Sequence, residues 1–211
     1  MSALDTLLDH PALWRGRSAT PAANTPVWPS GSAELDAALG GGWPQGQLIE
    51  LIGEPFGSGE TRLLVPLLAA RGRAGHWIAL VAPPATPWLP AWQQLGIPPE
   101  RVLLIRADND RDTLWGSEQC LRDGAFGALL AWLRGPVETA LLRRLRLAAA
   151  ESRACAIVYR PPRAAAQPSP AHQRLQWRPV ADGLELHCLK GAGHWARSGR
   201  ALHIPDPGPG H

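Results

Sequence analysis

A glycine-rich turn between two apolar segments is the feature that most constrains how this chain can fold. The turn runs from Gly53 to Gly59. Gln47 to Ile52 before it predict a short strand, and Thr61 to Ala70 after it predict a mostly apolar helix that Pro66 interrupts. A strand, a glycine-rich turn and a helix N-terminus form a ready anion site, because backbone N–H groups point inward and the helix dipole favours negative charge. The pattern therefore predicts an α/β domain with a phosphate-binding type of loop.

The loop departs from the working phosphate-binding pattern at two points. That pattern is G-x-x-x-x-G-K-[ST], in which the lysine reaches the β and γ phosphates and the hydroxyl holds magnesium. Here five residues, not four, separate Gly53 from Gly59, and Glu60 stands at the lysine position. Two unit charges about 4 Å apart interact by about 4 kcal/mol at an effective dielectric of about 20, so reversing this charge opposes polyanion binding. Thr61 keeps the hydroxyl, which leaves residual nucleotide binding open.

An architectural interpretation accounts for the same residues. Gly57 and Gly59 permit a tight turn, and Glu60 caps the helix that follows. Arg62 either neutralises Glu60 or faces an acidic ligand, and we favour the first. The positions of a degenerate phosphate loop are then Gly53, Gly57, Gly59, Glu60, Thr61 and Arg62.

The remaining parts of a nucleotide hydrolase are not evident in the sequence. Such an enzyme needs an acidic residue at the end of an apolar strand to position magnesium and water. The apolar segment Ala128 to Leu133 runs into Arg134 and Gly135, and Trp77 to Ala82 runs into two prolines. No Ser-His-Asp or Cys-His pair has a supporting motif, and none of the seven histidines shows ligand spacing. We therefore expect no enzymatic activity, no cofactor and no metal site.

Apolar segments and amphipathic segments alternate along the chain. This order predicts a RecA-like three-layer core, with a mainly parallel sheet flanked by helices and short antiparallel strands at its C-terminal side. Ser32 is a predicted N-cap, and Gly40 to Gly42 end the helix that it starts. Helices are predicted at Ala33 to Leu39, Trp88 to Leu95, Asp112 to Arg122 and Pro136 to Glu151. Further strands are predicted at Val102 to Ile105, Cys155 to Tyr159, Leu175 to Trp177, Leu184 to Leu189 and Ala201 to Ile204.

The two ends of the chain read differently from its centre. Leu4 to Trp14 predict a short amphipathic helix, and residues 15–30 predict an extended linker rich in Ser, Thr, Pro and Ala. Residues 160–173 are Pro/Ala-rich and predict an exposed loop. We expect an N-terminal segment at 1–30, one domain at 31–204 and a disordered tail at 205–211.

The composition indicates in which compartment the protein resides and which kinds of partner to expect. No apolar run reaches the roughly 18–20 residues of a membrane span, so no membrane is expected as a partner. Met1 to His10 carry two aspartates and no basic cluster, which does not fit a signal peptide. The three cysteines Cys120, Cys155 and Cys188 suit reduced thiols. We expect a cytoplasmic protein. Its net charge of +3 comes almost entirely from arginine, with Lys190 the only lysine, which leaves nucleic-acid contact open.

Three stretches together resemble a known family. The segment WPSGSAELDAALGGGWPQGQLIELIG resembles the approach to the phosphate loop in RecA recombinases. GSGETRLLVPLLAA is similar to the ImuA family, SulA/RecA-related proteins of bacterial translesion synthesis, in which G-x-G-E-x-R-L-L replaces the lysine motif. PAWQQLGIPPERVLLIRA and DTLWGSEQCLRDGAFGALLAWL follow in the same order as in both. The resemblance covers residues 28–160 and is most specific through 40–70 and 95–133.

The resemblance implies a RecA-like core without ATPase activity. It implies an accessory role in SOS-induced, error-prone translesion DNA synthesis, between a partner resembling the Y-family polymerase ImuB and an error-prone replicative-type polymerase. RecA or DNA are further candidate partners. The runner-up is a SulA-like inhibitor of cell division that acts on the tubulin-like division protein, and an ATPase with an atypical loop is a third possibility.

Two sets of side chains are candidate contact sites for a partner or nucleic acid. Arg143, Arg144 and Arg146 lie on one predicted helix, where a solvated face is the plainer interpretation. We expect the tryptophans Trp88, Trp92 and Trp115 to be half-exposed. They are candidate contacts because tryptophan and arginine often anchor interfaces. Trp77 and Trp132 fall in strand patterns and are predicted to be core residues.

Overall fold

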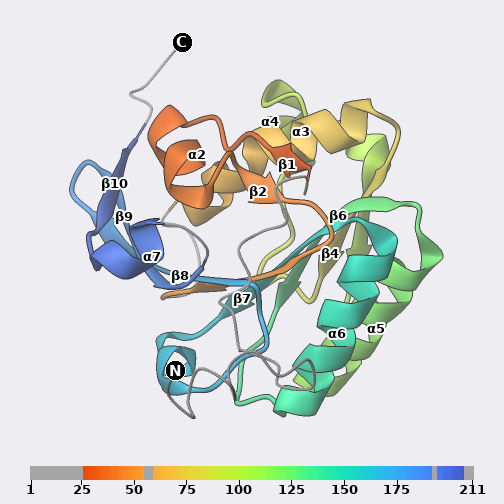
Figure 1. Ribbon diagram of the computed structural model, residues 1–211. Helices are drawn as coiled ribbons and strands as arrows, with labels where there is room; N and C mark the ends of the chain where they lie inside the picture. Colours follow the sequence, from red (N-terminus) through yellow and green to blue (C-terminus); the bar gives the residue numbers. More distant parts are fainter. Residues whose placement is uncertain (1–25, 55–58, 192–193, 207–211) are drawn as a thin grey trace, which may run out of the picture.

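An eight-stranded sheet forms the centre of the protein in the computed structural model, which describes residues 26–54, 59–191 and 194–206 (Figure 1). The strand order is β10-β9-β8-β3-β7-β6-β4-β5. The strands are β3 (Leu48–Ile52), β4 (Trp77–Val81), β5 (Val102–Ile105), β6 (Phe126–Trp132), β7 (Cys155–Arg160), β8 (Gln173–Val180), β9 (Gly183–Lys190) and β10 (Leu202–Pro205).

The sheet is parallel from β8 to β5 and antiparallel at its C-terminal side. β3 pairs in parallel with β7 and with β8, and the strands beyond β7 continue in parallel to the edge strand β5. β9 and β10 extend the sheet with antiparallel pairing. The predicted mixed α/β class and the predicted antiparallel extension are confirmed.

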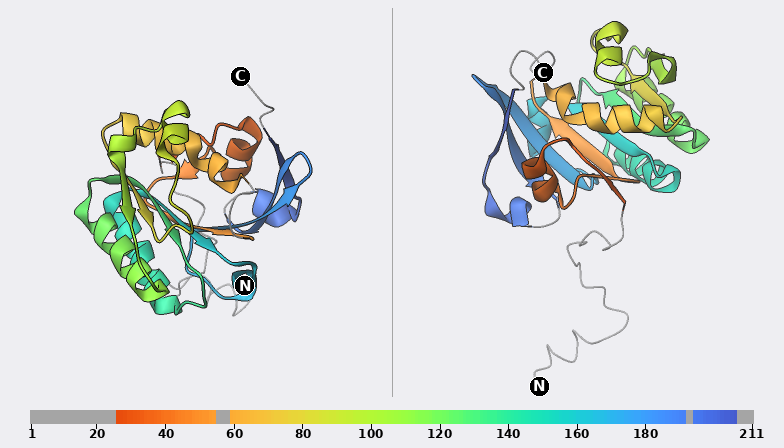
Figure 2. Two further views of the ribbon diagram at one scale, coloured as in Figure 1. Left: turned by 180° about the vertical axis from the view of Figure 1, so that it is seen from behind. Right: turned by 90° about the horizontal axis from the view of Figure 1, so that it is seen from above.

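Helices cover both faces of the sheet, as Figures 1 and 2 show. Leucines of two helices pack into the core on one face, together with Trp92 of a third. The helices of this face are α2 (Ala33–Leu39), α3 (Val65–Arg73) and α4 (Leu89–Gln94). On the other face, the second core cluster draws on α5 (Asp110–Asp123) and α6 (Thr139–Ser152). The short α7 (His194–Ser198) lies against β9.

The helix before the central strand begins and ends as its sequence predicts. The Ser32 side chain accepts a hydrogen bond from the Leu35 N–H, which satisfies one of the free donors of the first turn. Gly40 has a φ of 82°, in the left-handed region that glycine tolerates, and ends the helix. Strand β2 (Trp43–Pro44) follows and pairs with β1 (Val27–Trp28).

Three predictions about local structure need correction. The segment after the loop is a 3₁₀ helix, η1 (Glu60–Leu64), followed by α3, so Pro66 lies in the first turn of the α-helix. A proline is tolerated in that turn because the first N–H groups have no partner within the helix. Val27–Trp28, expected in the linker, form β1. Residues 160–173 are not a fully exposed loop, since they contain η3 (Pro162–Ala166) and the buried Ala164 and Ala171.

The C-terminal boundary of the domain also differs from the predicted one. Pro205 is the last residue of β10, and the Asp206 N–H donates to the Asp182 carbonyl at 2.8 Å, so neither belongs to a disordered tail. The helix predicted at Leu4 to Trp14 lies outside the described residues. No helix within the described ranges is long and apolar enough to cross a membrane.

Trp132 is buried as predicted, but Trp77 is not a core residue. Trp77 opens β4 and leaves 36% of its surface exposed, and the Arg101 guanidinium lies 5.7 Å from its ring centre. The neighbouring strand β5 is a four-residue edge strand, so little chain is available to cover this end of β4. A large aromatic in an apolar strand pattern therefore lies at the border of the core.

Candidate functional site

The degenerate loop follows the carboxyl end of β3, in the middle of the sheet. Gly53 leaves no room for a side chain, because an added Cβ would lie 2.4 Å from the Trp177 ring. Gly59 has a φ of 86°, in the left-handed region, as expected of a glycine that turns the chain into η1. Gly57 lies outside the described residues. These two glycines therefore have different roles: Gly53 permits close packing and Gly59 permits a turn.

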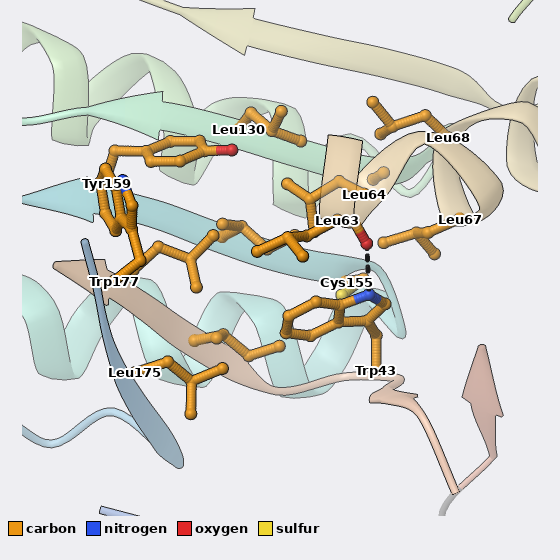
Figure 3. Close-up of a cluster of buried hydrophobic side chains, with 14 of the residues drawn as sticks. Trp43, Leu63, Leu64, Leu67, Leu68, Leu130, Cys155, Tyr159, Leu175 and Trp177 are labelled. Carbon is orange, nitrogen blue, oxygen red and sulfur yellow. Dashed lines mark hydrogen bonds between the residues drawn. The ribbon is translucent and has the colours of Figure 1, made fainter. Parts of the chain in front are cut away.

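Glu60 begins η1 and is buried, with 4% of its surface exposed. The next residues carry Leu63 and Leu64 into the core, and the Leu63 carbonyl accepts a hydrogen bond of 3.0 Å from the Trp43 indole (Figure 3). The carboxylate that replaces the lysine therefore belongs to a segment fixed by packing on the sheet. It does not project from an open loop.

The Tyr159 hydroxyl points toward this segment from β7. Burial raises the pKa of Tyr159, the charge of Glu60 raises it further, and the Thr61 side chain lowers it. Thr61, the candidate magnesium ligand, therefore has a buried tyrosine as its neighbour. The Tyr159 ring in turn stacks on Trp132 at 4.9 Å between ring centres and meets Trp177 edge-on at 5.9 Å.

Arg62 forms an ion pair with Asp206, with 2.6 Å between Nη1 and the carboxylate. We expected Arg62 to neutralise Glu60. The carboxylate that pairs with Arg62 here is that of Asp206, and nothing in the sequence indicated that this residue from the far end of the domain reaches the loop. Both side chains of the pair are more than half exposed, so its contribution to stability is small. The contact joins the loop to the end of β10.

An acidic residue does lie at the carboxyl end of β6, supplied by a different element. Asp110, in the first turn of α5, accepts hydrogen bonds from the N–H groups of Arg134 at 2.8 Å and Gly135 at 2.7 Å. This aspartate was not identified from the sequence, because β6 itself ends without an acid. Both Asp110 oxygens are engaged by the main chain, which holds the turn after β6.

A pocket of about 550 Å³ opens at the carboxyl ends of the central strands. In open α/β sheets this edge is where ligands usually bind. The floor includes the rings of Trp132, Tyr159 and Trp177. Ala82 lines the pocket with a φ of 53°, and within the described ranges only Arg153 shares a positive φ among non-glycine residues. The remaining lining residues are Gly53, Glu54, Pro84, Leu133, Arg134, Arg160, Pro161, Pro162 and Arg163.

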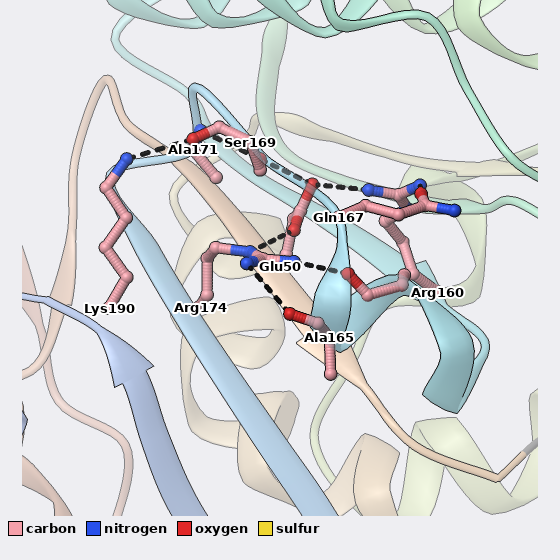
Figure 4. A network of polar contacts seen from close by, with 9 residues as sticks. Glu50, Arg160, Ala165, Gln167, Ser169, Ala171, Arg174 and Lys190 are labelled. Atoms are coloured by element: carbon pink, nitrogen blue, oxygen red, sulfur yellow. Dashed lines mark hydrogen bonds and ion pairs between the residues drawn. The ribbon is translucent and has the colours of Figure 1, made fainter.

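A buried ionic network supports one wall of this pocket (Figure 4). The Glu50 carboxylate in the middle of β3 lies 3.1 Å from Arg160 Nη1 and 2.7 Å from Arg174 Nε. Glu50 also accepts a hydrogen bond of 2.7 Å from the Ser169 hydroxyl. Lys190, on β9, donates to the Ser169 carbonyl, so it lies with this network and does not replace the missing lysine of the loop.

The same network holds the segment between β7 and β8. Arg174 Nη2 donates to the Ala164 carbonyl at 2.7 Å, and Arg160 Nη2 donates to the Gln167 side chain at 2.7 Å. Glu50, Arg160 and Arg174 are almost completely buried. None of the three was identified from the sequence, although a glutamate inside the apolar strand LIELI was a signal that a buried partner was required.

The candidate contact residues do not form a single surface. Arg144 pairs with Glu118 of α5 at 2.7 Å, while Arg143 and Arg146 are exposed. Trp88 and Trp115 are 70% and 62% exposed, but Trp92 packs partly against the core. Trp92 lies on the α3 face of the sheet, whereas Trp115 and the arginines lie on the α5–α6 face. The described residues contain no group of three or more His, Cys, Asp or Glu that could hold a metal ion.

Comparison with known proteins identifies two related groups. Residues 53–156 match the family model described as cell division inhibitor SulA. RecA of Porphyromonas gingivalis is 33% identical over 105 residues, covering 49% of this chain and 31% of RecA. RecA of Streptomyces ambofaciens is 34% identical over 105 residues, covering 49% of this chain and 28% of RecA. The chain thus spans about three tenths of the length of these RecA proteins.

A solved structure gives a further match. The crystal structure of SulA from Pseudomonas aeruginosa shares 27% sequence identity, covers 54% of this chain and 97% of the SulA chain, and has a TM-score of 0.44. By the family-model match, residues 53–156 are similar to SulA, and by the RecA alignments about half of the chain is similar to part of RecA.

Proposed function

We propose that this chain is a non-catalytic, RecA-like accessory protein of the ImuA kind, which acts in the cytoplasm during error-prone translesion DNA synthesis. The observation that carries the proposal is the loop: Glu60 stands at the lysine position, and it is buried in a packed segment. A phosphate loop without its cation, on a sheet whose sequence is similar to RecA, supports a scaffold that binds proteins. Its partners are a Y-family-like polymerase of the ImuB kind and an error-prone replicative-type polymerase.

Two exposed tryptophans, Trp88 and Trp115, are the proposed anchors for such partners. Trp88 and Trp115 are among the most exposed large apolar side chains in the described chain, and tryptophan is enriched among residues that dominate binding energy. Trp88 caps α4, on the α3 side of the sheet, and Trp115 lies on α5, on the other side, which suits an adaptor that meets two partners at once. Arg143 and Arg146 extend the α6 side of the Trp115 face.

The test is a binding measurement between the full chain and a Y-family-like polymerase of the ImuB kind from the same organism. We expect saturable binding by biolayer interferometry, weakened about tenfold or more by Trp88→Ala or by Trp115→Ala. Trp77→Ala is the matched control, since it removes a less exposed tryptophan that packs with Arg101. Absence of binding at concentrations up to about 50 µM, equivalent to roughly −6 kcal/mol, would contradict the adaptor role.

A second candidate function is inhibition of cell division, acting on the tubulin-like division protein. The match of residues 53–156 to the SulA family model favours it. A light-scattering assay of division-protein polymerisation separates the two functions. Inhibition at equimolar protein, with filamentous cells on overexpression, supports the division role; unchanged polymerisation and normal cell length would exclude it.

A further inference from the structure

The pocket at the carboxyl ends of the central strands, the carboxyl-edge pocket, has an apolar floor. Trp132, Tyr159 and Trp177 pack against one another there, and each has less than a tenth of its surface exposed. Rigid apolar surface is added to the walls by Pro84, Pro161 and Pro162. A concave site of about 550 Å³ with such a lining suits an apolar side chain.

The rim of the carboxyl-edge pocket carries positive charge that the described chain does not neutralise. Arg134 and Arg163 are exposed, and neither has an acidic partner within the described ranges. Arg163 Nη2 donates to the Arg134 carbonyl, which brings the two residues together. The third lining arginine, Arg160, is paired with Glu50, and Glu54 is the one acidic residue among the described residues that line the pocket. Two guanidinium groups at one rim are well suited to bind carboxylates.

The wall that carries Arg163 is held in place before any ligand arrives. Arg174 fixes the carbonyl of Ala164, the residue after Arg163, and Arg160 fixes Gln167. Taking the charges of Glu50, Arg160 and Arg174 out of water is costly, and a buried ionic network of this kind contributes positional specificity more readily than net stability. A rim fixed in advance lowers the entropy that binding would otherwise lose.

We propose that the carboxyl-edge pocket binds a short acidic segment of a protein partner, with an apolar side chain on the aromatic floor and neighbouring carboxylates on Arg134 and Arg163. Single-stranded nucleic acid fits less well. Base stacking needs an exposed aromatic face, whereas these rings cover one another. The inference is independent of whether the partner is a polymerase or the division protein.

A random heptapeptide library displayed on phage and selected on the full chain tests this inference. We expect the enriched peptides to place a Leu, Phe, Ile or Met next to Asp or Glu. A synthetic copy of the most enriched peptide should then bind Arg134→Glu and Arg163→Glu about tenfold or more weakly by fluorescence anisotropy. Arg73→Glu makes the same charge change at the exposed end of α3, away from the residues that line the pocket, and should leave the affinity unchanged.

Three outcomes would overturn the inference. The first is an enriched set without the acidic and apolar pattern, or no enrichment. The second is binding that Arg134→Glu and Arg163→Glu leave unchanged, in variants shown by thermal melting to be folded. The third is displacement of the peptide by an oligothymidylate 20-mer whose own binding is lost in Arg134→Glu, which would assign the rim to nucleic acid.

Discussion

The Glu50 carboxylate lies 2.7 Å from Arg174 Nε, between two adjacent strands and with both side chains almost completely buried. Arg160 approaches the same carboxylate from the strand on the other side. One negative charge therefore serves two guanidinium groups; the Ser169 hydroxyl also donates to this carboxylate, and Arg174 also donates to the Ala164 carbonyl. Removing the carboxylate would leave two buried cations without a counter-charge.

We expect Glu50→Ala to lower the free energy of unfolding by about 3–5 kcal/mol, the usual cost of breaking a buried ion pair from one side. Glu185→Ala is the matched control. Glu185 also contacts two basic side chains, Arg178 and His187, but on a partly exposed face, so its loss should cost clearly less than the loss of Glu50. Urea unfolding followed by tryptophan fluorescence measures both, and equal losses in the two variants would contradict a structural role for the network.

Gly53→Ala should destabilise the protein although it adds a single methyl group. The new Cβ would lie 2.4 Å from the Trp177 ring, so either the ring or the end of β3 must move. Overpacking of this kind costs about 1–3 kcal/mol. Gly116→Ala on α5 is the control, because its Cβ would meet other atoms only at 3.8 Å. We expect it to raise stability by up to about 1 kcal/mol, since alanine is the better helix former. Thermal melting that ranks the two variants the other way would refute the packing role of Gly53.

Elements that depend on local pattern could be predicted from the sequence. The Ser32 cap, the glycine after α2 and the apolar strand β6 follow from residues close together in the chain, and the structure has all three. Phosphate-loop residues could likewise be recognised from their spacing. The position of Glu60 inside a packed 3₁₀ segment could not be predicted in the same way, because it depends on how Leu63 and Trp43 meet across the core.

Interactions between distant residues were not predictable at the same level. Asp110 holds Arg134 and Gly135 only because α5 starts beside the end of β6, and Arg62 meets Asp206 only because β10 returns to the loop. Glu50 was the exception that the sequence did mark, as a charge inside an apolar strand. Its partners are more than a hundred positions away and needed the strand order of the sheet to be identified.

The buried thiols should react very slowly in the native protein. Burial raises the pKa of Cys120 to about 11 and that of Cys155 to about 12, and burial also raises the pKa of Cys188. Since the thiolate is the reactive form, little of it exists at pH 8. We expect mass spectrometry after iodoacetamide treatment to show modification first at the half-buried Cys188 and last at Cys155. In guanidinium chloride all three should react at one rate; rapid native modification of Cys155 would contradict its burial.

Stability should fall as the pH drops below neutrality, in part because of His172. Burial lowers its pKa, and the positive charges of Lys190 and Arg146 lower it further. A group whose pKa is lowered in the folded state stabilises that state above its unfolded pKa of about 6.5, and this stabilisation is lost as the pH falls through the folded pKa. We expect His172→Gln to reduce the loss of unfolding free energy between pH 7 and pH 5. His203→Gln, at a more exposed site beside Asp182, is the control. Its loss of unfolding free energy between pH 7 and pH 5 should be at least as large as that of the wild type. An identical pH dependence in wild type and His172→Gln would refute the prediction.

Restoring a lysine to the loop should not create a nucleotide hydrolase. Glu60 is buried beside Thr61 and Tyr159, so the side chain of Glu60→Lys would begin in a desolvated site and would not extend freely over bound phosphates. The acid nearest the end of β6, Asp110, is already engaged by two main-chain N–H groups. We therefore expect wild type, Glu60→Lys and Thr61→Ala to release phosphate from ATP at the rate of buffer, with or without single-stranded DNA. Glu54→Lys, which makes the same charge change at an exposed position near the start of the loop, is the control. Turnover by the wild type that Thr61→Ala abolishes would show an active ATPase, and turnover that appears in Glu60→Lys but not in Glu54→Lys would show that the lysine was the one missing part.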